Sequence, residues 1–295
     1  MDFYIRKLVE FGSSRADTFV DVSPDSLEDR GFWMLHEFKE KWAGHLDLRL
    51  GAYNPLGFQE GDLQGWNLLS KVGQAADYFG LLPERDDKLR YPHHIGFQES
   101  CQKAIELVQD FKKELHIHLD QANHSFEADT ERFIDVLEQQ GYQPIPGPPT
   151  IWLVHVISPS TYTEERFNQL VDRMRSMNLG VITCPSAAIS MRQYRPLVSP
   201  TSNSIARVLE FLAAGVPVRI GSDNLCDITM PMGTCDLVKE IFVLANAIRF
   251  YEIDILGSLS AGIPLNQEQI EKVKNHLRED DLMVSKVTSI HSKVN

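Results

Sequence analysis

Cysteine is scarce in this sequence. Four of the 295 residues are cysteine, at Cys101, Cys184, Cys226 and Cys235, and no two of them form a Cys-x-x-Cys pair. A disulfide framework is typical of short secreted chains with many regularly spaced cysteines, so this class is excluded. We therefore expect reduced thiols and a cytoplasmic protein.

Long apolar runs and basic clusters are absent as well. No apolar run approaches the roughly 18 residues that a membrane-spanning helix needs, and the opening MDFYIRKLVEFG carries charges in every turn, unlike a signal peptide. The formal net charge is −12 and Lys and Arg do not cluster, although a phosphate-binding surface requires such clusters. The sequence therefore predicts no membrane and no nucleic-acid partner.

What the sequence does contain is an alternation of short apolar runs and longer amphipathic stretches, in a chain whose length suits one large α/β domain. About seven segments have the pattern of strands. These strand segments are residues 18–22, 46–53, 77–82, 115–119, 151–157, 179–184 and 216–221.

Helical patterns follow the strand segments. They include the stripe from Phe97 to Val108, a helix over 130–140 with Gly141 as its C-cap, and a capping box of Thr161 with Glu164. A further helix runs from Ile205 and closes at Gly215, and a longer one covers 234–251. Strands that each precede a helix predict a parallel sheet with right-handed crossovers.

A (β/α) barrel and a doubly wound sheet are the two folds that such alternation allows. No Gly-rich phosphate fingerprint follows the first strand, which disfavours the doubly wound sheet and a nucleotide-dependent enzyme. Because the chain opens with a helix, we expect a (β/α)8-type TIM barrel that lacks its first strand. The barrel would span residues 1–265, and residues 266–295 would form a short C-terminal helix and a polar tail.

Candidate catalytic residues stand where predicted strands end. In a parallel barrel, reactive groups lie at the C-terminal strand ends and in the loops just after them. His116 and His118 are two apart on one strand, so both project from the same face. They can converge on one metal ion or lie in successive layers of the barrel interior. His155 ends the run IWLVH, and Asp223 follows VPVRIGS.

Histidine, histidine and aspartate from three strand ends match the ligand set of a catalytic Zn²⁺ or Fe²⁺ ion. Such an ion lowers the pKa of bound water to near 7 and so supplies hydroxide for attack on a C–N bond. The structural alternative is that a buried histidine is a core residue bonded to backbone, and that Asp223 caps its loop. Three such residues at equivalent strand ends favour the metal site.

The motifs resemble the amidohydrolase superfamily, in particular its cytosine deaminase and N-isopropylammelide amidohydrolase branch. The resemblance keeps the order of the motifs and covers roughly residues 3–250. Its most specific segments are HIHLDQANH and VPVRIGSDNLCDITMPMGTCDLV; LVHVIS, VITCPSAAI and RADTFVDVSPDS support it. The resemblance implies one divalent metal ion (Zn or Fe) and hydrolytic deamination or amide hydrolysis of a small heterocycle.

The same resemblance implies roles for single residues. His118 and Asp223 would bind the metal, and His155 would contact the metal-bound water or the substrate. Gln121 stands where cytosine deaminases have a proton-shuttling glutamate; an amide can orient substrate but cannot exchange protons. We therefore expect His155 and Asp223 to act in catalysis, with Gln121 beside them. Contacts with the substrate are expected from Gln121, His155 and Asn224.

Two departures from the family matter for this expectation. Relatives begin with a strand carrying His-x-His, which supplies two metal ligands. No such strand stands at the start of this sequence. The β-sandwich of the family is also absent, and Phe19 stands where many relatives have histidine. His118 and Asp223 alone would leave the metal under-coordinated, so His116, together with His155, is the expected replacement ligand.

The sequence therefore predicts a metal-dependent hydrolase of C–N bonds that acts on a small cyclic or heterocyclic substrate. The alternative is a truncated or catalytically impaired barrel that binds a ligand or a partner. Two sheet edges left exposed by a missing strand would invite pairing with another chain, so a homo-oligomer stays open. Substrate specificity would come from the loops at 53–58, 83–87 and 186–195, the last of which offers Arg192 and Arg195.

Overall fold

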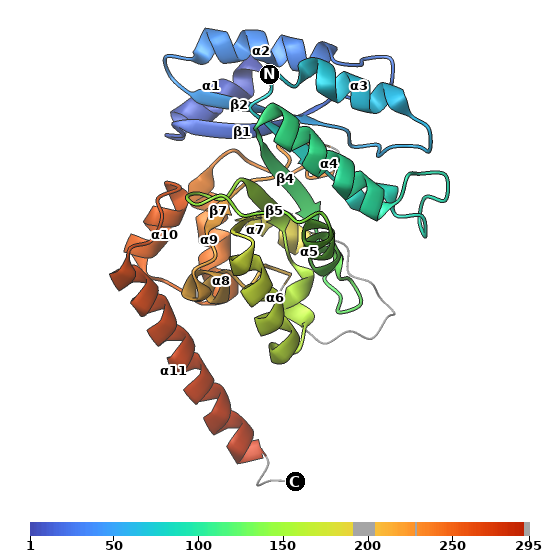
Figure 1. The fold of residues 1–295 in the computed structure, drawn as a ribbon. Coiled ribbons are helices and arrows are strands. Elements are labelled where there is room, and N and C mark those ends of the chain that lie inside the picture. The colour runs from blue at the N-terminus through green and yellow to red at the C-terminus, as the bar shows by residue number, and fades with distance from the viewer. Residues whose placement is uncertain (191–203, 228, 292–295) are drawn as a thin grey trace.

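A single parallel sheet of seven strands organises the molecule. The structure, a computed structural model, describes residues 1–190, 204–227 and 229–291. Each strand pairs in parallel with the next one in chain order (Figure 1). The strands are β1 (Arg15–Asp21), β2 (Asp47–Tyr53), β3 (Tyr78–Leu81), β4 (Glu114–Leu119), β5 (Ile151–His155), β6 (Leu179–Thr183) and β7 (Val218–Ile220). Each of them overlaps a strand that the sequence predicts.

Helices connect the strands and cover the outer face of the sheet (Figure 1). The α-helices are α1 (Asp2–Glu10), α2 (Arg30–Trp42), α3 (Leu63–Val72), α4 (Phe97–Phe111), α5 (Asp129–Gln139), α6 (Glu164–Ser176), α7 (Pro185–Ser190), α8 (Val208–Ala214), α9 (Leu237–Ile248), α10 (Ile253–Ser260) and α11 (Gln267–His291). Two short 3₁₀ helices, η1 (Pro83–Asp86) and η2 (Ser158–Thr161), follow β3 and β5.

The sheet is a parallel half-barrel. Among the strands that the structure describes, β1 and β7 are the two edges, and no ladder joins them. The predicted α/β class and the parallel order are therefore confirmed. Closure into an eight-strand barrel stays a prediction.

Alternation along β4 shows how the sequence divides its side chains between the two faces of the sheet. The apolar residues at odd positions are at most 1% exposed and belong to the core under the helices: Leu115, Ile117 and Leu119. The residues between them face the concave side: Glu114, His116 and His118. The helix-facing side thus supplies the hydrophobic core, while the concave side carries the polar groups.

Charged residues fill the concave side near the N-terminal strand ends. Arg49 lies 3.3 Å from Glu114 and 3.5 Å from Asp17, and Arg219 lies 3.8 Å from Glu114. The Arg219 guanidinium also covers the ring of Trp152 at 3.7 Å. These pairs place the opposite charges of four strands next to one another, so ion pairs link the strands at this end of the sheet.

Two local predictions differ from the structure. The N-cap of α6 is Thr163, whose hydroxyl accepts the Arg166 backbone N–H, whereas the Thr161 hydroxyl donates to the carbonyl of Ser158. The predicted capping box of Thr161 with Glu164 is therefore wrong, because Thr161 is the last residue of the 3₁₀ helix η2. Gly215 closes α8 at φ 84, as predicted, but Ile205 precedes that helix.

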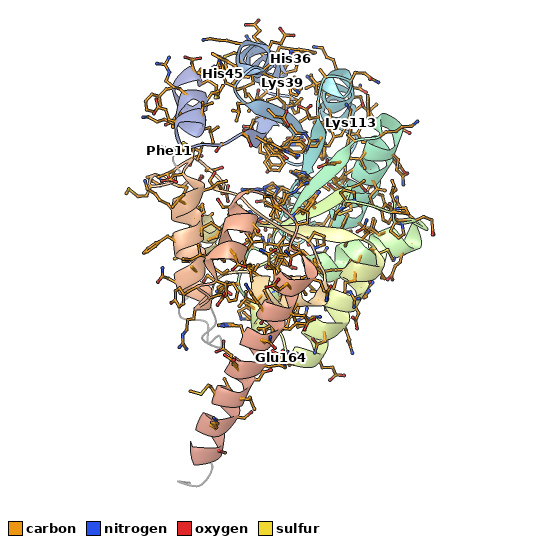
Figure 2. All side chains as sticks on the ribbon, turned by 90° about the vertical axis from the view of Figure 1, so that its left-hand side faces the viewer. Phe11, His36, Lys39, His45, Lys113 and Glu164 are labelled. Atoms are coloured by element: carbon orange, nitrogen blue, oxygen red, sulfur yellow. The ribbon has the colours of Figure 1, made fainter. Side chains whose placement is uncertain are left out.

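The C-terminal helix is longer than the sequence predicts. Helix α11 spans 25 residues, and Val273 in its first half is fully buried. Its far half projects from the rest of the molecule (Figures 1 and 2) and exposes Leu282, Met283 and Val284. Among the described residues, no helix combines the length and the apolar character that crossing a membrane requires.

Glu127 ties together the loops that follow β4 and β5. Its carboxylate accepts the backbone N–H of Ala122 at 2.7 Å and the hydroxyl of Ser158. The residue is 5% exposed, and burial raises the pKa of its carboxyl to about 7, with nearby Asp120 adding to the effect. The two loops therefore share one buried carboxyl group.

Gly51 is required by the packing inside the sheet. A Cβ added at Gly51 would lie 2.2 Å from the ring of Tyr78, which is fully buried and cannot withdraw. We expect Gly51→Ala to lower the free energy of unfolding by about 1–3 kcal/mol. Gly257→Ala in α10 is the control: its added Cβ meets no atom within 4 Å, and helix propensity predicts a gain of about 0.5–1 kcal/mol. Urea denaturation of both variants measures the difference, and equal stabilities would contradict the packing described here.

Glu127→Gln tests the buried carboxyl. Because the folded-state pKa is raised from 4.5 to about 7, the carboxyl contributes stability that is fully present below about pH 4.5 and is lost as pH rises through about 7. Relative to Glu127→Gln, the wild type should lose about 2–3 kcal/mol of unfolding free energy between pH 4.5 and 8. Urea midpoints across this range measure the loss, and parallel pH profiles for the two proteins would contradict it.

Candidate metal centre

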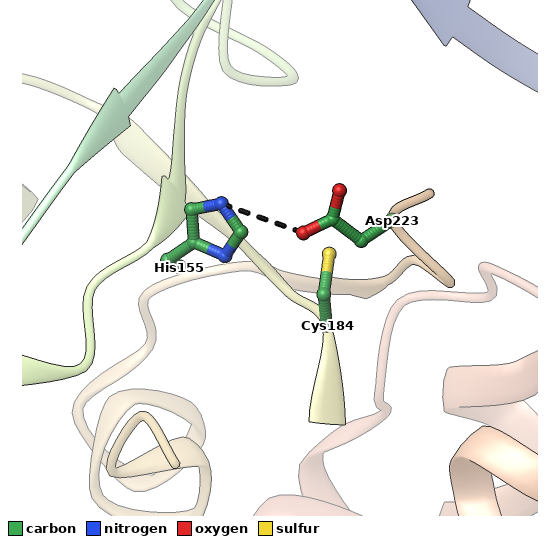
Figure 3. A group of neighbouring side chains, drawn as sticks. All are labelled: His155, Cys184 and Asp223. Atoms are coloured by element: carbon green, nitrogen blue, oxygen red, sulfur yellow. Dashed lines mark ion pairs between the residues drawn. The ribbon is translucent and has the colours of Figure 1, made fainter. Parts of the chain in front are cut away.

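Three of the predicted residues meet at the C-terminal edge of the sheet. His118 and His155 belong to the ends of β4 and β5, and Asp223 lies three residues after β7. The rings of the two histidines are 5.4 Å apart between centroids, and Nε2 of His155 lies 3.8 Å from Oδ2 of Asp223 (Figure 3). The structure therefore brings together two imidazoles and a carboxylate from three strand ends.

One hydrogen bond fixes the ring of His118. Its Nδ1 lies 3.2 Å from the backbone carbonyl of Leu81, and because a carbonyl can only accept, Nδ1 carries the proton. Burial and the neighbouring His155 lower the pKa of His118 to about 3, although Asp223 opposes this. At neutral pH the ring is therefore uncharged, and its Nε2 keeps a free lone pair.

His155 owes its direction to an unusual backbone. Strict alternation would turn it away from the concave side, because its neighbour Val154 is the register partner of His118. His155 has φ 76 and Val156 has φ 50, a conformation that is rare for residues other than glycine. The turn brings the ring to His118. Backbone strain of this kind accumulates at functional sites.

The imidazole of His155 is buried and incompletely bonded. The residue is 2% exposed, and its Nδ1 has no hydrogen-bond partner among the described residues. Its Nε2 is 3.8 Å from the carboxylate, which is beyond hydrogen-bond length. Burial lowers the pKa of His155 to about 4, so this ring is also neutral at pH 7.

Asp223 supplies the carboxylate of the group. It also has a left-handed backbone, with φ 59, and its side chain is 23% exposed. Burial raises the pKa of its carboxyl, while His118 acts in the opposite direction. The carboxyl therefore faces two neutral rings in a partly dehydrated place.

Cys184 joins this group, and the sequence reasoning missed it. Its sulfur lies with one ligand atom of His155 and one of Asp223, all within 4.8 Å of one another (Figure 3). The residue directly follows β6 and is 4% exposed. Its place just after a strand is the signal that could have found it, since the same criterion selected the other three residues.

His116 contacts other residues than this group does, so its role as a metal ligand stays a prediction. Its ring stacks on Tyr78 at 4.1 Å, and its Nε2 lies 3.3 Å from Oε2 of Glu114. It occupies the layer beneath His118, which is the second of the two arrangements that the His-x-His spacing allows. Residues two apart on β4 lie in successive layers of the concave side, so His116 and His118 belong to different layers.

Aromatic rings form the floor of the centre. Phe19 lies 4.8 Å from the ring of His118 and 5.4 Å from those of Tyr53 and Tyr78. A Cβ added at Gly80 would lie 2.7 Å from Phe19, so glycine at that position makes room for the ring. Phe19 is thus a packing residue of this floor.

The remaining predicted residues lie around the centre. Gln121 is half-buried in the loop after β4. Asn224 is exposed, and its amide donates to the hydroxyl of Thr229. Contact of either residue with a substrate stays a prediction. Arg192 and Arg195 lie outside the described residues.

The donor set fits a divalent metal ion. Two neutral imidazoles and a carboxylate are the ligand types that Zn²⁺ and Fe²⁺ bind in proteins. A hydrogen bond to a backbone carbonyl, such as the one that His118 makes, is common on the second ring nitrogen of metal-binding histidines. The unpartnered Nδ1 of His155 shows that hydrogen bonds within the described residues do not satisfy this ring.

Two bacterial proteins are similar to this chain in sequence, at low identity. No family model matches the chain. An uncharacterized protein of Haemophilus influenzae is 26% identical over 212 residues, which are 70% of this chain and 71% of that protein. A pterin deaminase of Rhizobium rhizogenes is 21% identical over 255 residues, or 86% of this chain and 54% of that protein.

Solved structures show the fold. The 5-methylcytosine deaminase of Klebsiella pneumoniae matches with a TM-score of 0.74 and 20% identity, over 88% of this chain and 62% of that one. The N-isopropylammelide isopropylaminohydrolase of Burkholderia multivorans matches with a TM-score of 0.69 and 21% identity, over 88% and 60%. The chain spans about six-tenths of the length of these structures. The resemblance seen in the motifs is confirmed at the level of the fold: this chain has the fold of the 5-methylcytosine deaminase and the N-isopropylammelide isopropylaminohydrolase.

Proposed function

We propose that this chain is a metal-dependent hydrolase of C–N bonds in small heterocyclic compounds. The observation that carries the proposal is the meeting of His118, His155 and Asp223 at one edge of the sheet. The fold of the deaminases and amidohydrolases described above supports it. The finer proposal for the fold is that these strands belong to a (β/α)8-type barrel.

Each member of the group has a role set by its atoms. His118 would hold one divalent ion, Zn²⁺ or Fe²⁺, through Nε2, and Asp223 would hold it through its carboxylate. When bound, such an ion lowers the pKa of a coordinated water to near 7 and so supplies the nucleophile. His155 would orient that water or the substrate with its ring nitrogen, because its neutral imidazole can accept or donate one hydrogen bond.

Asp223 is the group best placed to move protons. Hydrolysis adds the oxygen of water to the ring carbon, breaks the C–N bond, and requires a proton on the departing nitrogen. Because burial raises the pKa of the Asp223 carboxyl, this group is a better proton acceptor than an exposed aspartate. It can take a proton from water and pass it to the leaving ammonia or amine. Gln121 and Asn224 would orient the heterocycle, since amides donate and accept hydrogen bonds without exchanging protons.

The names of the similar proteins suggest the first substrates to test: 5-methylcytosine, N-isopropylammelide and a pterin. An aromatic floor of Phe19 and Tyr53 suits a flat ring, because rings stack on or against one another. All four cysteines are free thiols, which supports the proposed cytoplasmic compartment.

Gln121 favours a second candidate, a barrel that binds a heterocycle without turning it over. Glutamate at this position shuttles protons in cytosine deaminases, and glutamine cannot. The two candidates differ in their need for the metal group. Ligand binding by an impaired barrel would survive the loss of His118, whereas hydrolysis would not.

His118→Ala and Asp223→Asn test the proposed hydrolase. We expect either change to lower kcat at least a hundredfold and to reduce bound zinc, because each removes a metal ligand. Ammonia or amine release from the three compounds measures turnover, and elemental analysis measures zinc. His45→Ala is the control: His45 is exposed and lies at the outer surface near α2 (Figure 2), so its loss should change neither.

Two results would contradict the proposal. One is a wild-type protein that binds less than about a tenth of an equivalent of zinc or iron even after metal is added. The other is unchanged turnover in His118→Ala. Substrate binding without turnover, retained in both variants, would instead establish the binding candidate.

A further inference from the structure

Three neighbouring strand ends bring donors of three kinds to one place. His155 ends β5, Cys184 follows β6, and Asp223 follows β7, and these three strands are consecutive in the sheet. Figure 3 shows the sulfur of Cys184 beside the carboxylate of Asp223, and both groups on the same side of the His155 ring. The group therefore contains nitrogen, sulfur and oxygen donors.

The spacing of the donors is close to that of a tetrahedral ion. A zinc ion with bonds of about 2.0–2.3 Å holds its ligand atoms roughly 3.3–3.7 Å apart. Nε2 of His155 and Oδ2 of Asp223 are 3.8 Å apart, and the sulfur lies within 4.8 Å of both ligand atoms. Ordinary side-chain rotations of the order of 1 Å close this difference.

Apolar packing explains some of the contacts of the Cys184 side chain, but not all of them. The residue is buried beside Val154, Ala187 and Met230, as an inert core cysteine would be. An inert cysteine does not require a carboxylate and a buried imidazole beside its sulfur. A shared cation accounts for all three groups at once.

We propose that Cys184 is a metal ligand of this chain, through its sulfur, together with His155 and Asp223. The inference rests on the proposed function and goes beyond it, because neither the motifs nor the family resemblance assigned a role to this residue. On binding, the thiol releases its proton to the solvent and the thiolate gives an electron pair to the ion. His118, whose ring centroid is 5.4 Å from that of His155, would be the fourth protein ligand, and the water that hydrolysis requires would take a fifth position. In this site His155 would bind the ion itself instead of orienting the water.

This ligand set has a consequence for metal choice. Sulfur is a soft donor, which favours Zn²⁺, Co²⁺ or Fe²⁺ over Mg²⁺ and Mn²⁺. The set also supplies four donors from β4, β5, β6 and the segment after β7, without a His-x-His pair from another strand. Cys184 thus takes the place that the sequence analysis assigned to His116.

Cobalt titration tests the proposal directly. Metal-free protein is titrated with Co²⁺ alone, and a thiolate ligand produces a charge-transfer band in the near ultraviolet that nitrogen and oxygen ligands do not. We expect the band in the wild type and its loss in Cys184→Ser, with the Kd for Co²⁺ raised at least tenfold. Cys226→Ser is the matched control: this cysteine lies in the loop after β7, and its sulfur donates to the Gly233 carbonyl, so band and Kd should not change.

Three outcomes separate this inference from the proposed function. A band and a Kd that are unchanged in Cys184→Ser would overturn the role of Cys184 and leave the hydrolase standing. Cobalt binding by the wild type without the band would do the same. If the wild type binds neither cobalt nor zinc, both the inference and the proposed function fail.

X-ray absorption of the zinc-loaded wild type keeps the test independent of any variant's folding. We expect one sulfur scatterer at about 2.3 Å from zinc. A shell made of nitrogen and oxygen alone would overturn the proposal.

Discussion

Dehydration of two imidazoles beside one carboxylate is the constraint on which the rest of this site depends. Transfer of His118 and His155 from water into the concave side of the sheet lowers the pKa of each well below its ordinary value, so both rings are neutral at pH 7. The contact between His155 and Asp223 is then that of a neutral ring with a charge, not of two opposite charges. Neutral rings with free lone pairs are what a metal ion requires.

Contacts from the surrounding structure orient the two neutral imidazoles beside the carboxylate. A backbone carbonyl orients His118, a left-handed turn directs His155 inward, and the ring of Phe19 packs against His118. Beneath the floor, Glu114 neutralises the charges of Arg49 and Arg219 at a separate level. Polar groups are therefore sorted into layers, with ion pairs at one end of the strands and two neutral imidazoles beside one carboxylate at the other.

Much of this fold could be predicted from the sequence. Each of the seven strands was visible because apolar runs of four to eight residues alternated with amphipathic helices. Gly215 marked the end of α8 because glycine accepts the left-handed conformation at low cost. The place of His118, His155 and Asp223 followed from one rule, that reactive groups in parallel barrels lie at C-terminal strand ends.

Other features lay beyond that reasoning for physical reasons. Period-two alternation shows that His116 and His118 share a face but not that Glu114 and Tyr78 hold His116 one layer down. Nothing in the run IWLVH indicates the positive φ of His155, which depends on tertiary packing. The sequence analysis treated Cys184 only as one of four reduced thiols, because its closeness to His155 and Asp223 depends on how the ends of β5, β6 and β7 lie side by side. The length of α11 was missed because its polar surface resembles that of a tail.

The central claim is that one metal ion sits between His118 and Asp223 at this edge of the sheet. Anomalous diffraction at the zinc edge from crystals of the zinc-loaded protein tests it most directly. The account predicts one strong peak within bonding distance of His118 Nε2 and the Asp223 carboxylate, with the ring of His155 facing it. A zinc peak elsewhere in the protein, with none at this edge, would contradict it.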